Sequence, residues 1–97
     1  MSQAMAQGDA LVVNALGMHA RPAAELVKLA SAFSSHIQIE KGGVQVNAKS
    51  IMGVLMLAAE QGSRLMFSAE GDDALEAVAA LTALVASGFG EAGEEFE

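Results

Sequence analysis

One stretch near the middle of the chain, residues 36–47, constrains the fold more than any other. Apolar and polar residues alternate in HIQIEK at 36–41, which is typical of a strand with one buried face. A Gly-Gly pair follows, as in a tight hairpin turn, and VQVN at 44–47 then predicts a partner strand with Val44 and Val46 facing inward. An antiparallel pair with one apolar face needs a second layer to cover it.

The other segments predict two more strands and three helices. DALVVN at 9–14 and the alternating residues of 64–70 predict the strands. Apolar residues at helical spacing predict helices over 22–34 and 50–58. A last helix is expected to open at 71–73 and to stop at Gly88, with the apolar stripe Leu75, Val78, Leu81 and Val85. The order is β-α-β-β-α-β-α, and we expect an α+β fold, a two-layer sandwich with a four-stranded antiparallel sheet.

Length and composition indicate one domain with an apolar core, since the chain has 97 residues of which 53% are hydrophobic. We expect a flexible N-terminus at 1–8, the domain at 9–88 and a flexible acidic tail at 89–97. A net charge of −7 disfavours nucleic acid as a partner, and the absence of Cys excludes disulfides and thiolate metal sites. We see no signal peptide and no membrane-spanning run, so we expect a cytoplasmic protein.

The segment GMHARPAA at 17–24 combines a histidine, an arginine and the only proline of the chain. Pro22 is suited to the first turn of a helix, which places His19 just ahead of the helix. The start of a helix favours anions. An imidazole nucleophile, the guanidinium of Arg21 and a helix N-terminus together indicate a place to hold a phosphoryl group.

The predicted helix at 50–58 is apolar nearly all round and begins at Ser50, a suitable N-cap residue. A short helix in so small a domain cannot bury its whole circumference, so part of it should form a docking surface. The candidates for this partner-binding surface are Met18, Ile51, Met52 and Leu55, and the alternative for each is a place in the core.

Two segments resemble signatures of the HPr family, the histidine phosphocarriers of the bacterial phosphoenolpyruvate-dependent phosphotransferase system. LGMHARPA at 16–23 resembles the active-site signature, and NAKSIMGV at 47–54 resembles the signature around the regulatory serine. The resemblance implies an open-faced sandwich with three helices on one face of the sheet. It also implies that His19 accepts a phosphoryl group on Nδ1 from phosphorylated enzyme I and passes it to an enzyme IIA domain.

By the same resemblance, Arg21 accompanies the histidine and Ser50 is the serine that HPr kinase/phosphorylase modifies in many bacteria. Sugar-type members usually have a small polar residue where this chain has Leu16. In this respect the chain looks closer to the nitrogen-related branch of the system, whereas KSIMG at 49–53 looks like members with the kinase-regulated serine. The mixture leaves the pathway open and favours a regulatory role over sugar uptake.

We expect a monomeric carrier that uses no cofactor and no metal, rather than an enzyme with its own small-molecule substrate. The alternative is a regulatory binding module that acts through Ser50 and the apolar surface, although such a module would not need His19. A histidine-based hydrolase or metal enzyme is a third reading. For such an enzyme the chain lacks a Cys, a suitable pair of histidines and a second cluster of catalytic residues.

Overall fold

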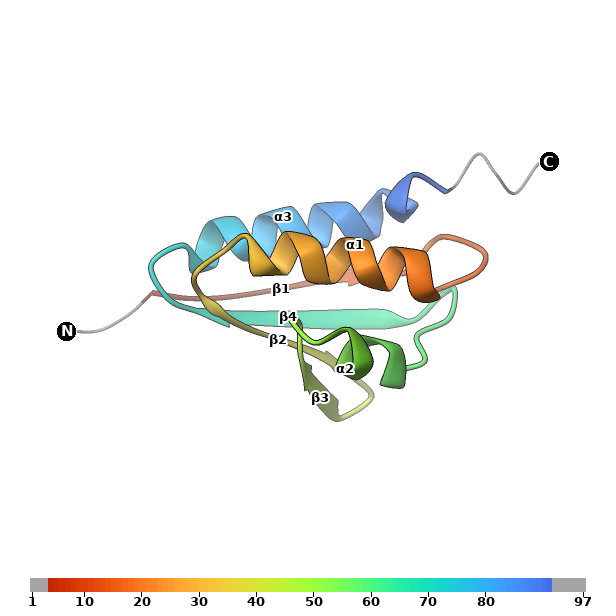
Figure 1. Ribbon diagram of the computed structural model, residues 1–97, viewed down its shortest axis with the longest axis horizontal. Helices are drawn as coiled ribbons and strands as arrows, with labels where there is room; N and C mark the ends of the chain where they lie inside the picture. The colour runs from red at the N-terminus through yellow and green to blue at the C-terminus, as the bar shows by residue number, and fades with distance from the viewer. Residues whose placement is uncertain (1–3, 92–97) are drawn as a thin grey trace.

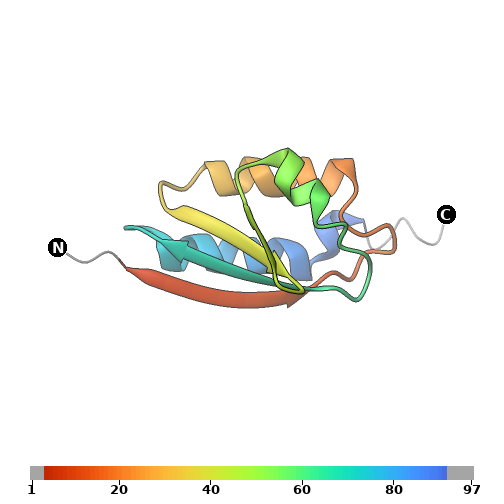
Figure 2. The same ribbon diagram turned by 90° about the horizontal axis from the view of Figure 1, so that it is seen from below.

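The computed structural model describes residues 4–91, and their elements follow the predicted order. One antiparallel sheet contains, in spatial order, β1 (Met5–Leu11), β4 (Arg64–Glu70), β2 (His36–Lys41) and β3 (Val44–Asn47). One face of it is covered by helices α1 (Ala20–Ser31), α2 (Ile51–Met56) and α3 (Ala74–Ala86), as Figures 1 and 2 show. A 3₁₀ turn, η1 (Gly88–Gly90), follows α3. The predicted α+β open-faced sandwich is confirmed.

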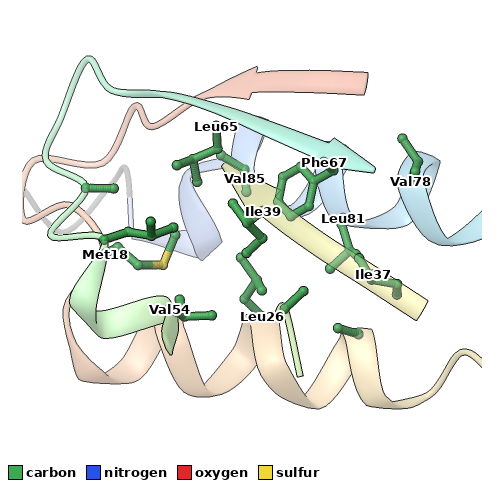
Figure 3. Packing of buried hydrophobic residues seen from close by; sticks show 14 of the residues in the cluster. Met18, Leu26, Ile37, Ile39, Val54, Leu65, Phe67, Val78, Leu81 and Val85 are labelled. Atoms are coloured by element: carbon green, nitrogen blue, oxygen red, sulfur yellow. The ribbon is translucent and has the colours of Figure 1, made fainter. Parts of the chain in front are cut away.

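The core lies between this face of the sheet and the helices (Figure 3). Alternate residues of the central strands point into it, as the period-two pattern predicts: Ile37, Ile39, Leu65, Phe67 and Ala69. The helices contribute Leu26, Val54, Val78, Leu81 and Val85. Phe67 has no exposed surface, and truncating such a side chain to alanine destabilises a fold by about 3–5 kcal/mol.

The first strand differs from the prediction, since it spans Met5–Leu11 rather than 9–14. Residues 5–8, which we expected to be flexible, pair with β4 in the register that joins Met5 to Glu70. Ladder hydrogen bonds use the backbone, so an edge strand can continue through residues that show no apolar alternation. Gly8 lets α3 approach closely, because a Cβ there would lie 2.8 Å from Cγ1 of Val78.

Helix α1 begins at Ala20 and ends at Ser31, earlier at both ends than the predicted 22–34. Pro22 lies within the first turn, where N–H groups have no acceptor inside the helix, so its missing N–H is tolerated. After the helix, the backbone N–H groups of Ser34 and Ser35 each donate to the carboxylate of Asp73 at 2.9 Å. These bonds tie the turn before β2 to the start of α3.

Helix α2 starts at Ile51 with Ser50 as its N-cap, and it ends at Met56 rather than at residue 58. Ala58 stops it, because its φ of 50° lies in the left-handed region that an α-helix excludes.

Two apolar residues that we expected to face inward are exposed. Val44 begins β3, an edge strand whose residues are mostly exposed. Leu75 is 71% exposed, because α3 turns its alanines inward, with Ala74 and Ala77 in the core. Small residues let a helix lie close to the sheet, so the buried stripe begins with Ala74 and Ala77 in place of Leu75 and continues through the expected Val78, Leu81 and Val85.

The expected boundary between the domain and an acidic tail at residue 88 is too early. Phe89 and Glu91 are both buried, and the backbone of η1 turns through positive φ angles at Gly88, Phe89 and Gly90. The remainder of the predicted tail, residues 92–97, lies outside the described residues.

Candidate functional site

His19 lies at the N-cap of α1, where the sequence places it. Its backbone is extended, with φ −84° and ψ −170°, and its carbonyl oxygen accepts from the N–H of Ala23 at 3.0 Å. The side chain makes no capping bond and is 37% exposed. The imidazole therefore stands beside the positive end of the α1 dipole and remains accessible to a partner.

The loop before His19 is held against the turn that precedes β4. The N–H of Met18 donates to the carbonyl oxygen of Ala59 at 2.8 Å. Gly17 adopts φ 68°, and a Cβ there would lie only 2.6 Å from the same oxygen. This close approach requires glycine, and it fixes the position of the loop that presents His19.

Met18 is a core residue, which corrects its assignment to a docking surface. It is 6% exposed and packs in the same cluster as Val54 (Figure 3). In a loop that crosses the end of the core, one side chain points inward and anchors the next residue outward. Met18 therefore anchors the loop that carries His19 in the core and does not form part of a partner-binding surface.

Glu91 is the central site residue that the sequence analysis missed. Its Oε2 lies 2.9 Å from Nε2 of His19 and 3.2 Å from Nη2 of Arg21. The turn after α3 brings it there, at the end of the molecule where α1 begins (Figure 1). Phe89 was the available signal, since an aromatic residue within a predicted solvated tail indicates that the chain folds back onto the core.

Asn14 completes the network and was also missed. It is fully buried, and its Nδ2 donates to Oε1 of Glu91 at 3.0 Å and to the carbonyl oxygen of Gly17 at 2.8 Å. Its Oδ1 has no hydrogen-bond partner among the described residues. A polar residue at the end of an apolar run, as in LVVN, is the sequence signal that would have identified it.

The carboxylate of Glu91 is ionised although it is buried. Burial raises its pKa, but the hydrogen bonds from Asn14 and His19 and the charges of His19 and Arg21 together lower the pKa below its ordinary value. Because Arg21 and His19 share one carboxylate oxygen, the guanidinium and the imidazole lie side by side. This arrangement can hold the oxygens of an anionic group next to the imidazole.

Ser50 and the exposed residues of α2 form a separate feature. The Oγ of Ser50 accepts from the N–H of Gly53 at 3.1 Å. Ile51 and Met52 are 41% and 66% exposed, whereas Leu55 is half-buried against the core. Within residues 4–91, Ser50 has no hydrogen bond to the network around His19. Helix α2 itself lies beside α1 (Figure 2).

Two kinds of feature are absent from the described part of the chain. No helix in residues 4–91 has the length and apolar character needed to cross a membrane. In the same residues, no group of three or more His, Asp or Glu side chains is arranged to hold a metal ion.

Comparison with known proteins matches residues 6–87 to the family model of the PTS HPr component phosphorylation site. The phosphocarrier protein HPr of Cupriavidus necator is 49% identical over 87 residues, which cover 90% of this chain and 98% of the relative. The phosphocarrier protein HPr of Treponema pallidum is 46% identical over 80 residues, which cover 82% of this chain and 91% of the relative.

Solved structures agree with these relatives. HPr from Thermoanaerobacter tengcongensis superposes with a TM-score of 0.85 at 50% identity and covers 89% of this chain and 97% of its own. HPr from Bacillus anthracis gives a TM-score of 0.81 at 49% identity and covers 84% of this chain and 98% of its own. By sequence and fold, this chain belongs to the HPr family of phosphocarrier proteins of the phosphotransferase system.

Proposed function

We propose that this protein takes a phosphoryl group from phosphorylated enzyme I onto Nδ1 of His19 and passes it to an enzyme IIA protein. Membership of the HPr family supports components of the phosphotransferase system as its partners. The observation that carries the assignment to His19 is local. A partly exposed imidazole stands at the start of α1, and it shares a carboxylate oxygen with a guanidinium.

Transfer of a phosphoryl group needs positioning and charge stabilisation more than covalent chemistry from the protein. The neutral imidazole attacks phosphorus, and the positive end of α1 lies beside the incoming oxygens. Arg21 is 52% exposed on its side chain, so its guanidinium can turn from Glu91 to the phosphoryl oxygens. Two parallel N–H bonds from the guanidinium then stabilise the charge of the transferring group.

The test is incubation with phosphoenolpyruvate and the cognate enzyme I, followed by intact-mass measurement. We expect one acid-labile phosphate on the wild-type protein and none on His19→Ala. The matched control is His36→Ala, which removes the exposed histidine at the start of β2 and should still accept the phosphate. Labelling of His19→Ala would show that the phosphate resides elsewhere.

The proposal places the protein in a regulatory, nitrogen-related pathway. Leu16 supports it, because this apolar residue is 74% exposed in the loop before His19, on the surface that a docked partner meets. We expect Leu16→Ser to slow transfer to a nitrogen-type enzyme IIA more than transfer to a sugar-type one. Equal effects on both acceptors, measured as single-turnover rates, would contradict the assignment to this branch.

Regulation at Ser50 is a further part of the proposal, with HPr kinase/phosphorylase as the partner. Ser50 adjoins the exposed side chains of Ile51 and Met52, so a phosphate there would add negative charge beside an apolar docking surface. Incubation with the cognate kinase and ATP should give an acid-stable phosphate that Ser50→Ala lacks. If Ser50→Ala is labelled to the same extent, the modified residue is a different one.

The same exposed residues of α2 favour a second candidate function, a regulatory module that binds targets without transferring phosphate. The two functions separate in one experiment. A carrier loses its effect on partners when His19 is replaced, whereas a binding module retains it and depends on Met52.

A further inference from the structure

We propose that Glu91, held in place by Asn14, is a positioning residue that fixes His19 in the tautomer whose Nδ1 carries the lone pair. The inference rests on the proposed phosphorylation of His19 and adds to it the groups that prepare the nitrogen for attack. Asn14 lies shortly after β1 and Glu91 just after η1, near opposite ends of the described chain.

A hydrogen bond joins the side chains of Glu91 and His19. Oε2 of Glu91 lies 2.9 Å from Nε2 of His19. An ionised carboxylate has no hydrogen to donate, so Nε2 must supply the hydrogen of this bond. A neutral imidazole has one N–H, and with that hydrogen on Nε2 the other nitrogen, Nδ1, has its lone pair available.

The side chain of Glu91 is held in place by a second hydrogen bond. Its Oε1 accepts from Nδ2 of Asn14 at 3.0 Å, and the same nitrogen donates to the carbonyl oxygen of Gly17 at 2.8 Å. A flipped amide would set Oδ1 of Asn14 against two acceptor oxygens, so the network determines its orientation. The buried Oδ1 is left without a partner in the described chain, which indicates that Asn14 is placed for its donors.

The backbone of the turn before Glu91 directs its side chain toward His19. Phe89 is 4% exposed and adopts φ 58°, a left-handed conformation that non-glycine residues seldom take. The N–H of Glu91 donates to the carbonyl oxygen of Gly88 at 2.9 Å and closes the turn. The buried aromatic ring anchors this turn, and the turn aims the carboxylate at His19.

Transfer to Nδ1 is compatible with this arrangement. The Nδ1 lone pair forms the new bond to phosphorus, the bond between phosphorus and the donor atom of enzyme I breaks, and its electron pair stays on the donor. Nε2 keeps its hydrogen, so the phosphorylated ring gains positive charge as the bond forms. Glu91 faces that charge and stabilises it in the same way that a buried aspartate supports a catalytic histidine.

The test measures the tautomer directly in ¹⁵N-labelled protein, from long-range ¹H–¹⁵N correlations of the imidazole. In the neutral wild-type ring we expect the hydrogen on Nε2. In Glu91→Gln, the amide oxygen is retained by Asn14 and the amide nitrogen faces Nε2, so the hydrogen should move toward Nδ1. Phosphoryl acceptance from enzyme I should fall about 10- to 100-fold, the range typical when a group that orients a metal-binding histidine is removed.

The matched control is Glu76→Gln, which removes an exposed carboxylate of α3 far from the site and should change neither tautomer nor rate. A wild-type ring with its hydrogen on Nδ1 would overturn the inference, and this measurement needs no variant to fold. So would a Glu91→Gln protein with a native backbone spectrum and an unchanged tautomer. A wild-type protein with the expected tautomer that takes no phosphate on His19 would instead refute the proposed function.

Discussion

Oδ1 of Asp73 accepts two hydrogen bonds from Ser35, one from its backbone N–H at 2.9 Å and one from its hydroxyl group at 2.5 Å. Hydrogen bonds from the hydroxyl group of Ser35, the N–H of Ser34 and the N–H of Ser35 outweigh the opposing effect of desolvation and lower the pKa of Asp73 to about 2. This contact joins the turn after α1 to the start of α3. It therefore ties the helix that begins after His19 to the helix that leads to Glu91.

Acid should therefore weaken the fold in a defined pH range. Since the pKa of Asp73 falls from 3.8 to about 2 on folding, its contribution is complete above pH 3.8 and is lost as the pH drops to about 2. We expect Asp73→Asn to be less stable at neutral pH and to show a shallower loss in that range. Denaturant unfolding at a series of pH values measures both. Parallel curves for the two proteins would disprove the coupling.

A methyl group at Gly17 should be far more harmful than one at Gly42. Both residues have positive φ, 68° and 57°, but only at Gly17 would a Cβ meet backbone, at 2.6 Å from the oxygen of Ala59. Gly42→Ala should lower the free energy of unfolding by about 1–2 kcal/mol. Gly17→Ala should lower it by about 1–3 kcal/mol more, because the loop must shift. Equal losses in equilibrium unfolding would argue against the close approach.

The alternating strands were predictable because their signal is local. Ile37 and Ile39 lie on one face of β2 whatever the rest of the chain does. The start of β1 was not predictable, because Met5 and its neighbours pair with the backbone of β4 and show no apolar alternation of their own. Leu75 misled for a related reason, since close packing of α3 depends on where its alanines fall.

The site divides in the same way. His19 and Arg21 stand in one short motif, so their proximity follows from sequence and helix geometry. Glu91 reaches them only because Phe89 takes a left-handed conformation and enters the core. Single-residue propensity argues against that conformation, and only the packing of the complete chain stabilises it.

Substitutions of Ser50 should separate its capping role from its proposed control of docking. Ser50→Ala loses the acceptor for the N–H of Gly53 and should destabilise the protein by about 1 kcal/mol. Transfer from enzyme I should stay near the wild-type rate. Ser50→Asp keeps a good cap and adds charge beside Ile51, so it should stay stable yet transfer several-fold more slowly. Thermal unfolding and single-turnover kinetics test the pair, and a fast Ser50→Asp protein would remove the argument for control by charge.

Replacement of Arg21 should slow transfer even when the charge is kept. Hydrogen bonds to charged groups contribute about 1.5–3 kcal/mol, so Arg21→Ala should reduce the transfer rate about 10- to 100-fold. Arg21→Lys should recover only part of this loss, because it lacks the planar fork. The control is Arg64→Lys, on β4 beside Asp9, which should transfer normally. Full activity of Arg21→Lys would show that charge alone suffices.

His19 and Glu91 are 72 residues apart in the chain, so the ribosome synthesises the histidine well before the glutamate. A ribosome releases the histidine, with its whole signature, well before α3 and the turn that ends at Glu91. A nascent or clipped chain therefore displays the imidazole without the carboxylate that contacts it. The contact between His19 and Glu91 therefore forms only after the last turn of the domain has been synthesised and has folded.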